Sequence, residues 1–193
     1  MLKCALGPRY DCEMRLGWLV TVGLASAMAA CSGGDGAPTC TGSGCACTGG
    51  ECTCAAGTDC KTTCGDGPCR VDCSSAAMCE ADTTDKLNLS CNDSSACKGT
   101  GGDDSILACN GSSTCDFKLG TSADVTCAST ATCTLELDGG SVICLDNSSC
   151  TVTCNGDCRV SCSGTAAACA LTCGSSGAAA NMCSASIFAC GPC

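Results

Sequence analysis

Pairs of cysteines that recur at a fixed interval constrain the fold of this chain more than any other feature. In five of these pairs the two cysteines enclose five residues, and the first members of successive pairs lie 18, 18, 18 and 17 residues apart. The pairs are Cys73/Cys79, Cys91/Cys97, Cys109/Cys115, Cys127/Cys133 and Cys144/Cys150. A constant step over such a length indicates a repeat protein in which each copy is one supersecondary unit.

Further cysteines extend this pattern toward both ends. The looser copies are Cys54/Cys60, Cys162/Cys169 and Cys183/Cys190, and the extra pairs Cys64/Cys69 and Cys154/Cys158 flank a second turn. Cysteine makes up 29 of 193 residues, a content typical of a disulfide scaffold in an oxidising compartment. We expect all these cysteines to form structural disulfides. Pairing within each turn is favoured, although bonds between neighbouring coils would satisfy the same Cα separation.

The residues between the cysteine pairs alternate in a way that predicts short strands. From the Cys73 copy to the Cys162 copy, the position two residues before the first cysteine is apolar, as at Val71, Leu89, Leu107, Val125, Val142 and Val160. The segments inside the pairs are rich in Ser, Asn, Asp, Gly and Thr, which favour turns. The expected fold is all-β, a disulfide-rich β-solenoid of about seven 18-residue coils. The alternative is an array of disulfide-closed β-hairpins, and the constant step favours the solenoid.

The N-terminal region has the pattern of an export signal. Residues 16–28 form an apolar run that is too short to span a bilayer and suits the core of a signal peptide. We therefore expect a signal peptide over 1–30 and a flexible Gly/Ser/Thr-rich tether over 31–53. The repeat domain is expected over 54–193.

The string Met28-Ala29-Ala30-Cys31 resembles the lipobox of bacterial lipoproteins, although Met28 stands where leucine is usual. The resemblance implies that Cys31 becomes the lipidated first residue of the mature chain. Ser32 follows it, which by the same resemblance implies the outer membrane. Removal of the signal and lipidation of Cys31 would leave 26 cysteines, enough for thirteen disulfides. The alternative is an ordinary signal, a secreted protein and a Cys31 that joins a disulfide.

The turn pattern C-x-x-S-x-x-C, present at Cys91–Cys97 and Cys109–Cys115, resembles the turn of beetle β-helical antifreeze proteins. In that family the two cysteines bond within one coil, and ice is bound by a stacked Thr-x-Thr array. The resemblance covers the turn alone, because the family's repeat is shorter. Thr151-Val152-Thr153 is the segment matched to the array.

Few residues carry catalytic chemistry. The chain has no histidine, and nothing marks a pair of carboxylates across a cleft, so no enzyme activity and no catalytic residue are expected. The net charge of −10 argues against a nucleic-acid partner. Cys190-Gly-Pro-Cys193 matches a thioredoxin-type redox motif but is interpreted as a terminal structural disulfide.

Ion binding is the alternative chemistry. Closely spaced cysteines such as Cys45, Cys47 and Cys52 favour thiolate-bound metal as one interpretation. Calcium is the other, because stacked coils would bring the aspartates of the second turn into one column. These aspartates are Asp66, Asp103, Asp104, Asp138 and Asp157.

The function expected from these observations is that of a non-catalytic lipoprotein on the cell surface with a structural or adhesive role. It would be held to the membrane through Cys31, need no cofactor and contact a protein or matrix partner. A calcium- or metal-binding exported protein is the first alternative, and an ice-binding protein is the second.

Overall fold

The structure is a computed structural model that describes residues 37–65, 67–164 and 167–193. The expected signal peptide, Cys31 and Asp66 lie outside these residues. All described residues belong to one compact unit, Gly33–Cys193. They form strands and turns without an α-helix, and so contain no helix that could cross a membrane.

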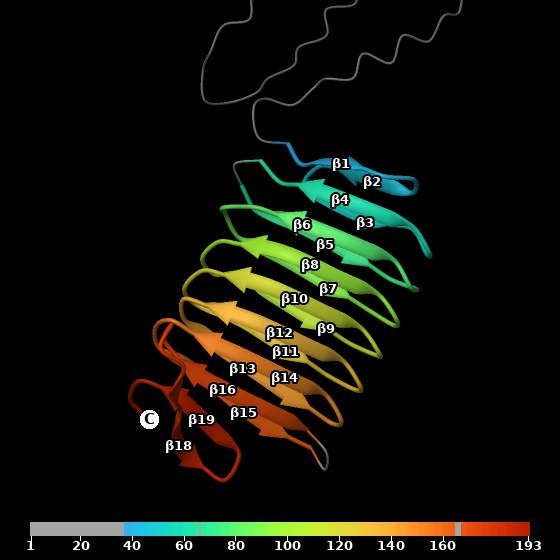
Figure 1. Ribbon diagram of the computed structural model, residues 1–193. Coiled ribbons are helices and arrows are strands. Elements are labelled where there is room, and N and C mark those ends of the chain that lie inside the picture. Colours follow the sequence, from blue (N-terminus) through green and yellow to red (C-terminus); the bar gives the residue numbers. More distant parts are fainter. Residues whose placement is uncertain (1–36, 66, 165–166) are drawn as a thin grey trace, which may run out of the picture. The chain divides into compact units, whose positions relative to one another are not determined.

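Two sheets contain all the strands (Figure 1). The first, named sheet A here, has the order β1 (Thr39–Thr41), β4 (Asp59–Thr63), β6 (Met78–Asp82), β8 (Ala96–Gly101), β10 (Thr114–Leu119), β12 (Thr132–Leu137), β14 (Ser149–Cys154), β16 (Ala168–Cys173) and β17 (Ala178–Ala179). The second, sheet B, has the order β18 (Asn181–Ser184), β19 (Ile187–Cys190), β15 (Cys158–Ser163), β13 (Gly140–Leu145), β11 (Ala123–Cys127), β9 (Ile106–Cys109), β7 (Leu87–Cys91), β5 (Cys69–Cys73), β3 (Glu51–Cys54) and β2 (Cys45–Thr48).

The chain alternates between the two sheets, so each coil contributes one strand to each. Neighbouring strands in the body of each sheet are parallel, and they pair cysteine with cysteine, as in Cys79↔Cys97 and Cys97↔Cys115. The 18-residue step therefore sets the register. This arrangement confirms the β-solenoid, and the hairpin array is wrong because strands pair between coils rather than within them.

The one 17-residue step is absorbed in a turn. Asp138 and Gly139 alone separate β12 from β13, and Ala123 pairs with Gly140 seventeen residues later. Gly140 has φ +130°, and an added Cβ would lie 2.1 Å from the Ala123 carbonyl oxygen. Glycine is required here because the shorter turn brings two backbones into close approach.

Turn composition follows from backbone geometry. The second residue after the first cysteine of a turn has a left-handed conformation in successive coils, at Ser75, Asp93, Gly111, Ser129 and Asp146. Gly, Asp and Ser suit this position, because glycine has no Cβ and short polar side chains can hydrogen-bond locally. The turns are thereby able to stack with the same geometry in each coil.

The interior is a thin layer of cysteines and apolar side chains. Sheet B contributes the predicted apolar column, in which Val71, Leu89 and Leu107 are nearly inaccessible to solvent. Cys54, Cys60 and the cysteines of every later coil border this layer, and disulfides close the coils at the turns. Because the two sheets lie so close together, a disulfide replaces much of the apolar area that a wider core would bury.

The last coil with a turn disulfide differs from the earlier ones. Cys162 bonds Cys169 within the turn, as expected, but the two lie seven residues apart, one more than in the regular pairs. Cys169 is also only partly buried, whereas Cys150 beside it in sheet A is buried. The difference arises at the edge of the sheet, because β17 pairs only with Thr172 and Cys173 and leaves the start of β16 uncovered. Cys169 therefore closes a coil without joining the fully buried core.

Antiparallel strands close the stack at both ends. At the N-terminal end, β1 pairs with β4 and β2 pairs with β3, held by disulfides Cys40–Cys45 and Cys47–Cys52. Residues 39–53 were expected to belong to a flexible tether, and the structure instead places them in strands. Two short disulfide loops explain the difference, because they hold these strands against the first coil and cover its edges.

The C-terminal end departs from the repeat. Cys183 and Cys190 were predicted as a last copy of the turn, whereas Cys190 bonds Cys173 and Cys183 bonds Cys193. The pairing of Cys190 with Cys193 is likewise wrong. Both differences arise because β18 and β19 form an antiparallel hairpin against β15, so their cysteines face other partners than in a parallel coil.

Candidate functional site: the outer face of sheet A

Side chains on the outer face of sheet A lie in three rows that run across the strands from β4 to β16. Each strand contributes one residue to each row. Row 1 is Asp59, Met78, Ala96, Thr114, Thr132, Ser149 and Ala168. Row 2 is Lys61, Glu80, Lys98, Asp116, Thr134, Thr151 and Ala170, and row 3 is Thr63, Asp82, Thr100, Lys118, Glu136, Thr153 and Thr172. The parallel register creates these rows, because residues about 18 apart become direct neighbours.

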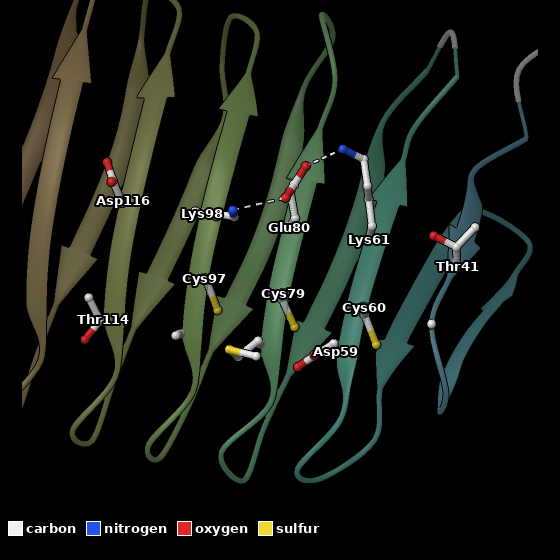
Figure 2. Close-up of a pocket in the computed structure, with 13 residues that line it drawn as sticks. Thr41, Asp59, Cys60, Lys61, Cys79, Glu80, Cys97, Lys98, Thr114 and Asp116 are labelled. Atoms are coloured by element: carbon white, nitrogen blue, oxygen red, sulfur yellow. Dashed lines mark hydrogen bonds and ion pairs between the residues drawn. The ribbon is translucent and has the colours of Figure 1, made fainter.

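Row 2 begins as a line of alternating charges (Figure 2). Glu80 lies between two lysines, in contact with Lys61 on one side and 3.2 Å from the Lys98 ammonium on the other. Hydrogen bonds from Lys61, and then from Lys98, hold the pKa of the Glu80 carboxyl below its ordinary value. The same contact raises the pKa of Lys61. Both shifts favour the charged forms of Glu80 and Lys61.

A second charged contact lies in row 3. The Lys118 ammonium is 2.9 Å from a Glu136 carboxylate oxygen, and the hydrogen bond from Lys118 lowers the pKa of Glu136. Asp82 accepts a hydrogen bond of 3.1 Å from the Thr100 hydroxyl. These contacts join neighbouring coils across the surface and are exposed, so each stabilises the fold only slightly.

The charged part of the face borders a groove of about 630 Å³. Thr41 and Gly42 contribute one end of it, beside the β1 strand, and Thr114 and Asp116 the other (Figure 2). Its apolar lining includes Ala96 and Met78, and the Met78 side chain is 55% exposed. Exposed apolar side chains beside charged ones are typical of surfaces that bind another molecule.

Hydroxyl groups dominate the outer face of β12 and β14. Thr132, Thr134, Ser149 and Thr151 form a block in rows 1 and 2, and the Thr172 hydroxyl donates to Thr153 at 3.4 Å in row 3. Thr132-Cys133-Thr134 is another Thr-x-Thr segment, in the strand next to the Thr151–Thr153 segment considered from sequence. It was missed although the 17-residue offset between β12 and β14 brings the two together, and lining up the cysteines would have found it.

Among the described residues, the aspartates of the second turn do not come together as a group of three potential ligands. Asp103 accepts hydrogen bonds from the Thr121 amide at 2.7 Å and from the Thr121 hydroxyl at 2.8 Å, which lower the pKa of its carboxyl. Asp138 accepts from the Asn155 amide group. These carboxylates hydrogen-bond to the turn of the following coil, and Asp66 lies outside the described residues.

In the part of the chain that the structure describes, candidate metal ligands come together only as cysteines. Within 37–65, 67–164 and 167–193, each group of three potential ligands consists of cysteines, for example Cys73, Cys79 and Cys97. Cysteines 45, 47 and 52, considered for thiolate clusters, are also in disulfides. A disulfide sulfur is not a thiolate and does not bind zinc or copper in the same way. Asp104 and Asp157 join no such group.

Comparisons with protein-family models, curated proteins and solved structures found no match to this chain.

Proposed function

We propose that this chain is an exported, non-catalytic lipoprotein of the cell surface, anchored through Cys31, whose outer face of sheet A makes adhesive contacts. The lipid on Cys31 would place the protein in the outer membrane. The observation that carries the anchor is the use of cysteines. Thirteen disulfides pair every cysteine from Cys40 to Cys193 with another in that range. No cysteine of that range is left to bond Cys31, which supports its role as a lipid attachment site.

Rigidity and surface chemistry support the adhesive role. Disulfides at successive turns hold a regular face, on which charged and hydroxyl side chains repeat from coil to coil. A rigid surface of this kind loses little conformational entropy when a partner binds.

Labelling with a lipid precursor tests the anchor. Expressed in a bacterium that processes lipoproteins, the chain should incorporate labelled fatty acid, and the Cys31→Ala variant should not. Ser32→Ala is the matched control, because it alters the neighbouring residue and keeps the thiol. A wild-type chain without label, or a labelled Cys31→Ala variant, would refute the anchor.

Ice binding is a second candidate, favoured by the block of hydroxyls over β12 and β14. Thermal hysteresis of the purified protein would be lost in Thr134→Lys, which places a charge in the centre of the block. Thr126→Lys on the outer face of sheet B is the control and should retain it. A wild-type protein without thermal hysteresis removes this candidate.

A further inference from the structure

The first four residues of row 2 alternate in charge, so the same row read in the opposite direction presents an opposite charge at every position. They read Lys61, Glu80, Lys98 and Asp116 along β4, β6, β8 and β10. A second copy whose coils stack in the opposite direction would present aspartate to Lys61 and lysine to Glu80. A surface that pairs with itself in this way is the requirement for an isologous two-fold contact.

We propose that a second copy of this chain docks on the outer face of sheet A. The two-fold axis would run parallel to the strands and pass between β6 and β8. This axis keeps each row opposite the same row and reverses the order of coils, so β4 faces β10 of the partner and β6 faces β8. Lys61 then meets the partner's Asp116, and Glu80 meets the partner's Lys98, each pair occurring twice.

The apolar residues of row 1 fit the same arrangement. Met78 lies in β6 and Ala96 lies in β8, so each methionine faces the partner's alanine. Met78 is one of the few exposed large hydrophobic side chains in the described part of the chain, and both residues line the groove. A long side chain opposite a short one lets the faces approach, while burial of the methionine stabilises the contact.

Row 3 adds polar contacts in this register. Asp82 faces the partner's Thr100, and within one chain the Thr100 hydroxyl already donates to Asp82. Thr63 faces the partner's Lys118. Neither pairing sets like charges against each other.

Other positions of the axis are less favourable. An axis along β6 or β8 would set Glu80 against Glu80 or Lys98 against Lys98. An axis between β8 and β10 would oppose Asp82 and Glu136 in row 3 and leave Glu80 facing Thr134. An axis between β4 and β6 would pair only Lys61 with Glu80. Electrostatic complementarity therefore selects one register.

Asp116 is the one charged residue among these four that forms no ion pair within the described chain. Its strand neighbour Lys98 is bonded to Glu80. The Lys61 ammonium contacts Glu80 and lies 3.9 Å from Asp82, and its three N–H donors allow one more acceptor. The contact between copies would supply a partner for Asp116.

The direction of the two copies gives the contact a role in adhesion. Reversal of the stack points the β1 ends of the two copies in opposite directions. This consequence rests on the proposed function, in which lipid on Cys31 precedes β1 in the chain. Copies anchored at opposite ends suit a contact between two facing membranes rather than within one.

Zero-length carbodiimide cross-linking tests the contact directly. Within one chain Lys61 and Asp116 lie three strand spacings apart, about 14 Å, so a direct bond between them requires two copies. The exported full chain in mild detergent, from about 10 μM to about 1 mM, covers the range of weak interfaces. Mass spectrometry of mixed ¹⁴N and ¹⁵N chains should find this bond between copies at a yield that rises with protein concentration and falls with salt.

Charge-swap variants provide the decisive comparison. Glu80→Lys and Lys98→Glu should each reduce the cross-link yield by about tenfold, and an equal mixture of the two should restore it. Arg70→Glu is the matched control on sheet B, because its side chain is 65% exposed, against 67% for Lys98, and also lies in an ion pair between strands. It should leave the yield unchanged.

A missing Lys61–Asp116 bond at every concentration overturns the contact, as does a mixture that fails to recover it. The lipid anchor is independent of these outcomes. Cross-linked copies without label on Cys31 would refute the anchor alone, and labelled chains that never cross-link would refute the docking alone.

Discussion

The two halves of sheet A differ on both surfaces although they share one repeat. In β4, β6 and β8 the central inward position is Thr62, Ala81 or Gly99. In β10, β12, β14 and β16 the same position is Phe117, Leu135, Val152 or Leu171. The outer face changes at nearly the same point, from alternating charges to hydroxyl groups.

The two halves of sheet A are therefore stabilised differently, one mainly by apolar burial and the other mainly by disulfides. Strands β10–β14 bury large apolar side chains beneath sheet A, whereas β4–β8 bury little there and rely more on turn disulfides. Apolar burial stabilises in proportion to area, while a disulfide acts chiefly by restricting the unfolded chain. The coils of the first half should therefore depend more strongly on their disulfides.

Reduction of the disulfides should have the largest effect. Each native disulfide of this kind contributes about 2–4 kcal/mol, so full reduction should unfold the chain. Under limiting reductant, hydrogen exchange should accelerate first in β4–β8 and later in β10–β14. Simultaneous loss of protection in both halves would contradict the comparison.

Phe117→Ala should be the most damaging single core substitution. It removes a ring that is 2% exposed and makes β10 resemble the first half, at a cost of about 3–5 kcal/mol in the free energy of unfolding. Chemical denaturation with the disulfides intact measures the change. Thr134→Ala on the exposed face of the adjacent strand is the control, with an expected change within about 0.5 kcal/mol.

Gly99→Ala should destabilise the first half by about 1–3 kcal/mol, because there is no room for a side chain. An added Cβ would lie 1.8 Å from the Ala81 carbonyl oxygen, and φ is +149°. Gly57→Ala is the matched control, since its φ is also positive but no atom lies within 4 Å of the added Cβ. Equal losses of stability in the two variants would show that backbone conformation, rather than close packing, requires glycine at position 99.

The smallest expected effect is the pH dependence of stability that arises from the Glu80 carboxylate. Because the folded-state pKa of Glu80 is lowered, its charged contacts stabilise the fold above the ordinary pKa of about 4.5, and this contribution is lost as pH falls through the folded-state value. In a carboxyl NMR titration, Lys61→Gln should raise the pKa of Glu80, and Lys118→Gln should leave it unchanged. The outer positions of β14 and β16 carry no titratable side chain, so that part of the face should not respond.

Much of the fold was predictable because the repeat is encoded locally. Alternation with a period of two orients Leu89 and Val125 inward, and the spacing of Cys91 and Cys97 brings both to one turn. The disulfides within turns follow from the same spacing. Sequence reasoning failed at residues 39–53 and at Cys183, Cys190 and Cys193, because antiparallel capping strands do not follow the 18-residue period.

The sequence by itself determined the strand–turn repeat, its 18-residue register and the apolar column of sheet B, since each depends on residues close together in the chain. Tertiary structure decided which strands cap the stack and which cysteines join there. It also decided that Lys61, Glu80, Lys98 and Asp116 stand in one row. Such neighbours are separated by whole coils, and only stacking brings their side chains onto one surface.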